Sequence, residues 1–331
     1  MIQYIEESLN NRGIEKMILE SLRKAQGHIS GEELSKHLGV SRQALWKHIQ
    51  SLKGLGYDII AVPHLGYRLL RATDRILPYE IQQDLSTKIF GHKVYYFNSV
   101  SSTMDIAHQL GAKGVSEGAV VMSETQTKGR GRIGRQWFSP KYKGLYASLI
   151  LRPKIPPRDA AVITLLTAVA AYEAINRVTG LQPQIKWPND IILKNKKLAG
   201  ILTELSAEQD VVHFIVVGIG INVNNDEDEL LAQATSLKKQ KGSSVNRAEL
   251  FQEFLRSMES WYFSFCKDGS GPILENWRRY ALTLNHRVRV CINRQYIEGE
   301  AVDVDSDGGL ILRRDSGLLE KITAGEITHL Y

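Results

Sequence analysis

The sequence feature that most constrains this chain is a basic, glycine-rich stretch between Lys128 and Trp137. Three glycines alternate with three arginines there, and a tryptophan ends the run. A packed core does not accommodate this composition, because glycine loses backbone entropy on ordering and an unpaired guanidinium is expensive to bury. Backbone N–H groups next to glycine and forked guanidinium groups both bind phosphate or carboxylate well. The stretch therefore predicts a loop that an anionic ligand orders, with a solvated basic linker as the alternative.

Length and composition favour a globular protein of two or three domains. The chain has 331 residues, 43% of them hydrophobic, and a formal charge of +6 that suits nucleic acid or anionic ligands. Its two cysteines, Cys266 and Cys291, have no metal-like spacing, which favours a reducing compartment over a disulfide or zinc framework. The apolar run from Ala160 to Tyr172 is shorter than a bilayer requires, and the first residues lack a signal-peptide core. We therefore expect a cytoplasmic protein without a membrane segment.

The first seventy residues have the pattern of a winged helix-turn-helix domain. A capping-box pattern begins a short helix at Ser30, and Gly39 ends it with a turn. Ser41 is the expected N-cap of the next helix, whose apolar residues recur at helical spacing. Two short strands at 58–62 and 67–70 then supply the wing.

The second helix of this domain and the wing hold the candidate DNA contacts. Polar and basic side chains at the start of such a helix contact phosphates and base edges in helix-turn-helix proteins. The candidate DNA-binding residues are Ser41, Arg42, Gln43, Lys47, His64 and Arg68. A small helical domain used for protein contacts is the alternative. We place the DNA-binding domain at residues 1–70 and a basic linker at 71–78.

Residues 79–270 indicate a central domain that mixes strands and helices. Strand character is found at 94–97, 119–123, 146–151 and 211–217, and an apolar helix is expected at 159–178. Strands in runs beside helices favour an α+β domain over alternating βαβ units. Gly218 and Gly220 follow a strand, but no third glycine completes a dinucleotide fingerprint, and the chain has no Walker loop.

Residues 271–331 indicate a separate small β domain. Short strands are expected at 288–292, 296–304, 310–313, 318–322 and 326–330, with turns rich in aspartate, serine and glycine between them. This pattern predicts a β-barrel. The chain as a whole is therefore predicted to be an α+β protein with an N-terminal winged helix-turn-helix, a central mixed α/β domain and a C-terminal β-barrel.

Three motifs taken together are far more specific than any one of them. The stretch from Gly129 to Trp137 is followed by Lys186-Trp187-Pro188-Asn189-Asp190 and then by Lys197-Leu198-Ala199-Gly200. In order and spacing this set resembles the biotin protein ligase family. With the winged helix-turn-helix in front, the chain resembles the bacterial bifunctional form, which is both biotin ligase and biotin operon repressor. The resemblance covers essentially the whole chain, and it implies a class II synthetase-like central domain and an SH3-like last domain.

The resemblance implies a two-step reaction. Biotin carboxylate attacks the α-phosphorus of ATP, with Mg²⁺ on the phosphates, and gives biotinyl-5′-AMP and pyrophosphate. A lysine of the biotin carboxyl carrier protein of acetyl-CoA carboxylase, or of a related carboxylase, then accepts the biotin. The resemblance also implies that biotinyl-5′-AMP is the corepressor for operator DNA and favours a homodimer.

The resemblance assigns site residues one by one. Catalysis is assigned to Arg132, Lys186 and Lys197. Biotin binding is assigned to Ser102, Thr103, Met104, Gln126, Gly129, Arg130, Gly131, Arg132, Lys197 and Gly200. ATP and adenylate binding is assigned to Arg130, Arg132, Arg135, Trp137, Lys186, Asn189, Asp190 and Asn222. Asp190 is a candidate for the Mg²⁺ side, and no metal site built from protein ligands alone is expected.

Two departures from the family pattern and two alternative functions remain. Ile133 stands where an arginine can stand in the family, and Met104 replaces a common polar residue, so neither side chain is counted on for a polar contact. A repressor whose ligase domain has lost catalysis is one alternative, although Arg132 and Lys197 are both present. A lipoate ligase, which shares the fold, is the other.

Overall fold

The computed structural model describes residues 13–292 and 294–330. The chain forms two compact units, and the boundary along the sequence lies between Arg75 and Ile76. From residue 13 onward, where the structure describes it, the first unit contains three helices and a two-stranded antiparallel sheet. These elements are α2 (Gly13–Lys24), α3 (Gly31–Leu38), α4 (Arg42–Gly54), β1 (Asp58–Val62) and β2 (Gly66–Arg71). They agree with the expected winged helix-turn-helix.

Local sequence signals set the ends of the helices in this unit. The Ser30 hydroxyl accepts the Glu33 N–H at 3.0 Å, and the Ser41 hydroxyl accepts the Ala44 N–H at 3.1 Å, so each serine satisfies a donor that its helix leaves free. Gly39 ends α3 with a φ of 65°, in the left-handed region that favours glycine. The fully buried side chains of Leu34 and Ile49 contribute to the small core between the helices.

The second unit contains a seven-stranded sheet, a five-stranded sheet and the helices that cover them. Its first half holds α5 (Pro78–Gln82), β3 (Val94–Phe97), α6 (Thr103–Ala112), β4 (Val120–Ser123), the 3-10 turn η1 (Arg132–Gly134), β5 (Leu145–Leu151), η2 (Pro157–Asp159) and α7 (Ala160–Thr179). There follow β6 (Gln184–Lys186), β7 (Asp190–Leu193), β8 (Lys196–Glu208), β9 (Val211–Ile221), η3 (Glu227–Glu229), α8 (Leu237–Lys241), α9 (Arg247–Asp268) and α10 (Gly271–Tyr280). The last strands are β10 (Arg287–Ile292), β11 (Gln295–Val304), β12 (Leu310–Arg313), β13 (Leu319–Ile322) and β14 (Glu326–His329).

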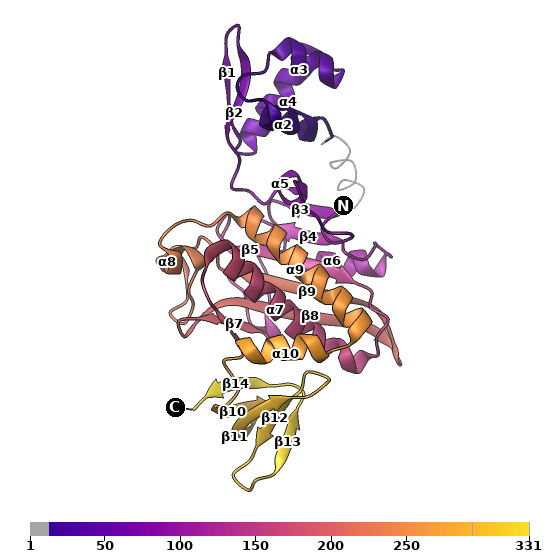
Figure 1. The fold of residues 1–331 in the computed structure, drawn as a ribbon, viewed down its shortest axis with the longest axis vertical. Coiled ribbons are helices and arrows are strands. Elements are labelled where there is room, and N and C mark those ends of the chain that lie inside the picture. The colour runs from indigo at the N-terminus through magenta and orange to yellow at the C-terminus, as the bar shows by residue number, and fades with distance from the viewer. Residues whose placement is uncertain (1–12, 293, 331) are drawn as a thin grey trace. The chain divides into compact units, whose positions relative to one another are not determined.

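The seven-stranded sheet is mixed and separates two different environments. Its order is β3-β4-β5-β9-β8-β7-β6, with β3 and β4 parallel and the other neighbours antiparallel. Alternation along β9 sends Ile215, Val217 and Ile219 into the core beneath α7 and α9. Gly218 and Gly220 therefore lie on the opposite face, which α6 covers in part and where the candidate site lies. Figure 1 shows α7, α9 and α10 together on one side of the sheet.

Helix α7 has the expected bounds to within one residue, but it continues beyond the apolar run expected at 160–172. It runs for 20 residues, and together with η2 it is long and apolar enough to meet the length and composition criteria for a membrane span. Most of its apolar side chains are buried in the hydrophobic core, and Leu166 and Val169 are fully so. The apolar run is therefore longer than the sequence indicated, and its hydrophobicity is accounted for by the core.

The five-stranded antiparallel sheet, in the order β13-β12-β11-β10-β14, shares one hydrophobic core with the seven-stranded sheet. Trp187 is 2% exposed and joins the two, because its indole Nε1 donates to the Gly308 carbonyl at 3.0 Å and its N–H donates to the Thr283 hydroxyl at 2.9 Å. Residues 271–280, which the domain prediction gave to the C-terminal domain, form α10 and pack against α7 and α9. The buried apolar residues of α10 therefore belong to the helical layer that α7 and α9 form.

Candidate functional site

A cavity of about 510 Å³ opens on the face of the seven-stranded sheet that α7 does not cover. The stretch from Arg130 to Phe138, which contains most of the Gly/Arg loop (Lys128–Trp137), forms one wall, and the turn between β6 and β7 forms another. Residues 229–234 and 325–328 complete the rim. Five cationic and three anionic side chains line it, so an empty cavity carries a positive excess suited to phosphate or carboxylate.

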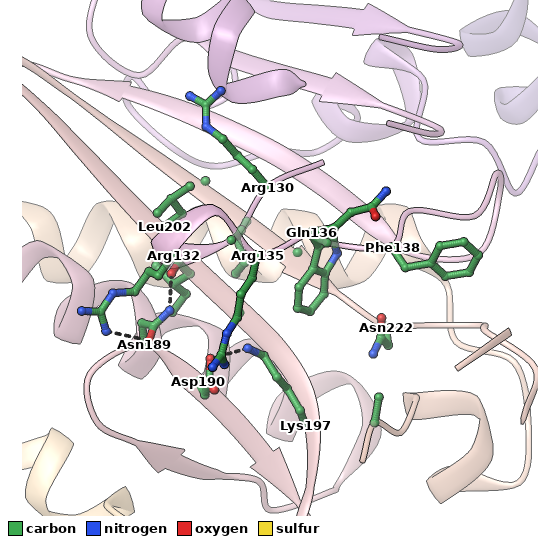
Figure 2. Close-up of a pocket in the computed structure, with 18 of the residues that line it drawn as sticks. Arg130, Arg132, Arg135, Gln136, Phe138, Asn189, Asp190, Lys197, Leu202 and Asn222 are labelled. Carbon is green, nitrogen blue, oxygen red and sulfur yellow. Dashed lines mark hydrogen bonds and ion pairs between the residues drawn. The ribbon is translucent and has the colours of Figure 1, made fainter. Parts of the chain in front are cut away.

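Arg130 faces away from the cationic part of this cavity. Its guanidinium is ion-paired with Asp105 on α6 and donates to both oxygens of Glu204 on β8. Hydrogen bonding to Glu204 raises the pKa of Arg130 above its ordinary value. Figure 2 shows its side chain pointing away from Arg132 and Lys197. The Arg130 side chain therefore anchors the base of the loop, and the predicted contacts of Arg130 with biotin and the adenylate stay predictions.

Arg132 lies where the loop meets the central and C-terminal sheets. Its Nη1 donates to Asn189 Oδ1 at 3.3 Å and to the Gly325 carbonyl at 3.2 Å. Burial lowers the pKa of Arg132, although Asp190 and Glu326 oppose that shift. Two long hydrogen bonds to neutral acceptors leave much of a desolvated guanidinium available, which suits it to an incoming anion.

Two lysines and an aspartate form the floor of the cationic region. Lys197 Nζ lies 2.7 Å from Asp190 Oδ1, and Asp190 pairs with Gly200 across β7 and β8 (Figure 2). Burial lowers the pKa of Lys186, while Asp190 raises it and Lys197 lowers it further. Binding of a polyanion would offset the repulsion between the two ammonium groups. Arg135 reaches the same region from the rim and pairs with Glu326 at 2.5 Å.

The Trp137 indole packs against two glycines of the sheet. Gly200 and Gly220 are partners across β8 and β9, and a Cβ atom at Gly220 would lie 2.5 Å from the indole. Lys197 Nζ lies over the indole, 5.6 Å from the ring centroid, in a cation–π arrangement. The paired glycines thus give the indole its seat, and Gly218 similarly leaves room for the Met104 thioether. The glycines that resembled an incomplete dinucleotide fingerprint are packing positions.

The other end of the cavity carries neutral hydrogen-bonding groups. Thr103 donates its N–H and its hydroxyl to Gln126 Oε1 at 2.8 and 3.1 Å. Ser102 is 1% exposed, and its hydroxyl has no hydrogen-bond partner among the described residues. An orphaned buried hydroxyl that lines a cavity is satisfied when a polar ligand enters.

Nearly all of the predicted ligand-binding residues line this one cavity. They are Ser102, Thr103, Met104, Gln126, Arg130, Gly131, Arg132, Arg135, Trp137, Lys186, Asn189, Asp190, Lys197, Gly200 and Asn222. Gly129 does not line it, because it is packed within 2.6 Å of the Trp137 carbonyl and 2.9 Å of the Ser139 hydroxyl, measured from an added Cβ. Ile133 is 72% exposed at the loop tip and also lies outside the lining.

The sequence interpretation missed two parts of the wall. Phe138 and the segment from Leu230 to Gln233 line the cavity, and both Phe138 and Leu231 are largely exposed. Exposed apolar residues in a polar loop were the available signal. Residues Gly325 to Thr328 also line it, so the C-terminal sheet completes the cavity.

The described residues contain no group of three or more His, Cys, Asp or Glu side chains that could hold a metal ion. Asp190 is the carboxylate of the cationic floor, and it is already paired with Lys197. A magnesium ion here would take most of its ligands from phosphate and water, as Mg²⁺ commonly does.

The candidate DNA-binding residues lie on α4 and the wing of the first unit. Arg42, Gln43 and Lys47 are exposed on α4, and Arg42 is ion-paired with Glu32. Ser41 is occupied as the N-cap, so its hydroxyl is engaged by the helix. His64 and Arg68 are exposed on the β1–β2 hairpin. Trp46, which was left out of the candidates, is 54% exposed one turn beyond Arg42 on α4.

Three family models match the chain in the order of its parts. The helix-turn-helix domain matches residues 15–68, the biotin/lipoate A/B protein ligase family matches residues 96–222, and the biotin protein ligase C terminal domain matches residues 283–330. The last match begins after α10, in agreement with the packing of that helix on the central domain.

Similar proteins cover nearly all of the chain. The bifunctional ligase/repressor BirA of Bacillus spizizenii is 40% identical over 90% of this chain and 93% of its own length. The protein of the same description from Escherichia coli is 32% identical over 90% of this chain and 92% of its own length. The structure of the biotin protein ligase from Aquifex aeolicus in complex with biotin and ATP has a TM-score of 0.62 and 29% identity, and it covers 72% of this chain and 99% of that chain. The chain belongs to the biotin/lipoate A/B protein ligase family, and its three matched domains place it with the bifunctional ligase/repressors.

Proposed function

We propose that the chain is a biotin–[biotin carboxyl carrier protein] ligase that forms biotinyl-5′-AMP from biotin and ATP, and that it also represses transcription from operator DNA. The observation that carries the ligase proposal is the polarity of this cavity. Neutral hydrogen-bond donors and acceptors lie at one end of the cavity, and arginines and lysines lie at the other. The Trp137 indole, packed against two glycines of the sheet, lies between the two ends. Biotin has a neutral ureido head and an anionic carboxylate, so its two ends match the two ends of this cavity.

Ser102, Thr103 and Gln126 bind the ureido head in this proposal. A neutral planar group is matched better by hydroxyl and amide partners than by charges, and the Ser102 hydroxyl is the free donor. Trp137 and the backbone at Gly200 form the wall beside the acyl chain. Met104 contributes a thioether surface, since it packs on Gly218.

Arg132 and Lys197 bring the two anions together. The carboxylate oxygen attacks the α-phosphorus, the bond to the pyrophosphate oxygen breaks, and the two cations neutralise the charge on the α-phosphate. Lys186 and Arg135 bind the polyphosphate, and Asn189 and Asn222 add hydrogen bonds on the nucleotide side. Mg²⁺ bound to the phosphates would supply further charge neutralisation, with Asp190 as the nearby carboxylate.

The second step uses an amine from the partner protein. The acceptor lysine attacks the acyl carbon of the mixed anhydride, the bond to AMP breaks, and the biotinyl amide forms. The Gly/Arg loop closes over the adenylate to exclude water until the carrier protein of acetyl-CoA carboxylase, or of a related carboxylase, arrives. The chain acts in the cytoplasm, where carrier protein, ATP and DNA are all available.

The repressor function uses the first unit. Exposed Arg42, Gln43 and Lys47 on α4 contact the operator, and the β1–β2 hairpin contacts its backbone through His64 and Arg68. Biotinyl-5′-AMP is the corepressor, because it favours a homodimer that reads two half-sites.

Biotin-dependent exchange of labelled pyrophosphate into ATP tests the ligase proposal. The intact chain should catalyse exchange with biotin and not with lipoate. Exchange with lipoate alone would instead identify a lipoate ligase. Tight biotin binding without any exchange would identify a ligand-responsive repressor without catalysis, and either result contradicts the proposal.

A further inference from the structure

A chain of hydrogen bonds lies behind the neutral end of the cavity. Ser148 is a fully buried hydroxyl on the apolar strand β5, and it donates to Thr103 Oγ1 at 2.8 Å. Thr103 in turn directs both of its donors to Gln126 Oε1. Because Oε1 accepts both of these bonds, the Gln126 amide presents its Nε2 group on the other side.

Ser139 accepts the bond from that Nε2 group. Its Oγ lies 3.2 Å from Gln126 Nε2 and 3.2 Å from the Trp137 carbonyl, to which it donates its own proton. Gln126 uses one Nε2 hydrogen for Ser139 and keeps the other for a ligand in the cavity that it lines. The two serines themselves do not line the cavity, and Ser139 is 5% exposed.

The same Ser139 hydroxyl is built into the stem of the Gly/Arg loop. The Trp137 N–H donates to the Gly129 carbonyl at 2.9 Å and closes the stem, and the space beside Gly129 is filled by the Trp137 carbonyl and the Ser139 hydroxyl. Thr125 fixes Ser139 from behind, since its hydroxyl donates to the Ser139 carbonyl at 2.6 Å. One hydroxyl thus contacts the amide at the neutral end and the backbone that seats the Trp137 indole.

We propose that Ser139 is a positioning residue that couples recognition of the ureido head at Gln126 to closure of the Gly/Arg loop over the adenylate. The inference rests on the proposed ligase function. A head group that accepts from Gln126 Nε2 holds the amide in place, and the amide then keeps the Ser139 proton on the Trp137 carbonyl. Ser148 contributes to recognition of the ureido head but not to loop closure, because its hydroxyl donates to Thr103 and not to the loop.

The coupling predicts different effects for the two serines. Ser139→Ala should raise the KM for biotin and shorten the half-life of the enzyme-bound adenylate, each by up to about tenfold, the equivalent of one net hydrogen bond. Ser148→Ala should raise the KM for biotin while the adenylate half-life stays as in the unmodified chain. Ser139→Thr retains a hydroxyl and should retain both properties.

A matched control removes a buried hydroxyl elsewhere. Ser257 on α9 is 6% exposed, and its hydroxyl donates to Glu173 on α7, remote from the cavity lining. Ser257→Ala should lower the thermal unfolding midpoint without changing KM or adenylate half-life, and it therefore shows what a loss of stability alone does.

The experiment measures KM and kcat by pyrophosphate exchange, release of labelled adenylate, and thermal unfolding for all four variants. An unchanged adenylate half-life in Ser139→Ala, or an equal shortening in Ser148→Ala, would overturn the coupling. Equal losses in Ser139→Thr and Ser139→Ala would also overturn it, because the hydroxyl would then not be the operative group. Should Ser139→Ala unfold, a shortened adenylate half-life in Ser148→Ala would still overturn the coupling. Absence of exchange in the unmodified chain would contradict the proposed function itself.

Discussion

Arg132 is the residue on which the loop, the β6–β7 turn and the C-terminal sheet converge. It donates to Asn189 and to the Gly325 carbonyl, and its removal leaves no buried charge behind. We predict that Arg132→Gly folds normally but releases the bound adenylate roughly tenfold or more faster, since hydrogen bonds to a charged group contribute about 1.5–3 kcal/mol. Release of labelled adenylate from purified protein measures the effect. Arg158→Gly, at a largely exposed arginine of η2, is the control, and equal release rates for the two variants would remove Arg132 from this role.

Gly220 provides a second prediction at the same scale. A Cβ at this position would meet the Trp137 indole at 2.5 Å, so Gly220→Ala must displace the ring from its seat. We expect the KM for biotin to rise by about an order of magnitude and the tryptophan fluorescence to change, because overpacking of about 1–3 kcal/mol has to be relieved by moving the indole. Gly271→Ala, at a glycine of α10 with no atom within 4 Å of the added Cβ, should leave both unchanged. An unchanged KM in Gly220→Ala would show that the position of the Trp137 indole against Gly220 does not affect biotin binding.

The direction of individual side chains is what the sequence could not supply. Spacing identified the three arginines of the loop as a group, but it could not separate Arg130 from Arg132. The partners that turn Arg130 away, Asp105 and Glu204, are 25 and 74 residues distant in sequence. The difference depends on tertiary contacts that only the folded chain provides, as do the roles of Ser139 and Ser148.

Strand β14 shows how one element links the C-terminal sheet to the cavity. It carries Glu326, which pairs with Arg135, and His329, whose ring lies 5.6 Å from that of His286. Burial, with help from Lys186 and His286, lowers the pKa of His329 to about 4. The folded state therefore favours the neutral form of the His329 ring, whereas a histidine in the unfolded state titrates near pH 6.5.

The sign of the resulting pH dependence follows from this shift. The stability associated with neutral His329 is complete above about pH 6.5 and is lost as the pH falls from there toward about 4, because the unfolded state binds the proton first. We predict that urea unfolding midpoints at about pH 7.5 and about pH 5 differ more for the unmodified chain than for His329→Gln, given the ordinary pKa of an unfolded histidine. His213→Gln, at an exposed histidine on β9, should behave as the unmodified chain. Parallel pH slopes for all three proteins would contradict the prediction.

Helix α4 is the element on which the DNA prediction depends. Arg42 and Lys47 are exposed on it, and phosphate contacts make binding salt-dependent through counterion release. The double variant Arg42→Ala/Lys47→Ala should bind operator DNA more weakly and lower the slope of log K against log salt by about 0.9 for each lost contact. Lys16→Ala/Lys24→Ala removes the same charge from exposed positions of α2 and is the matched control. If both double variants changed the slope equally, general charge and not α4 would be responsible.

Elements were easier to predict than their assembly. The strand expected at 310–313 is β12 with the same bounds, and the helix expected at 159–178 differs from α7 by one residue at each end. Alternation and capping residues are local signals, so a single sequence carries them. The contacts of residues 271–280 with α7 and α9 were not predicted, because an amphipathic helix shows which face is buried and not which elements bury it.

At the scale of the whole molecule, a repressor needs ligand occupancy in the second unit to change DNA binding by the first. An operator with two symmetric half-sites favours a repressor that binds as a dimer. If the adenylate favours the dimer, linkage requires that the dimer binds the adenylate more tightly than the monomer does. We therefore predict that biotin plus ATP raises the weight-average mass in sedimentation equilibrium, and that biotin or ATP alone does not.

The Arg132→Gly variant distinguishes occupancy from the mere presence of ligands. It should need a higher concentration of biotin and ATP to reach the same mass, because it loses the adenylate faster while its first unit is unchanged. The affinity for operator DNA should rise with the weight-average mass. Adenylate binding should strengthen dimerisation by the same factor by which dimerisation strengthens adenylate binding. If the mass stays constant while adenylate is bound, the adenylate does not drive dimerisation, and coupling of ligand occupancy to repression through a homodimer is contradicted.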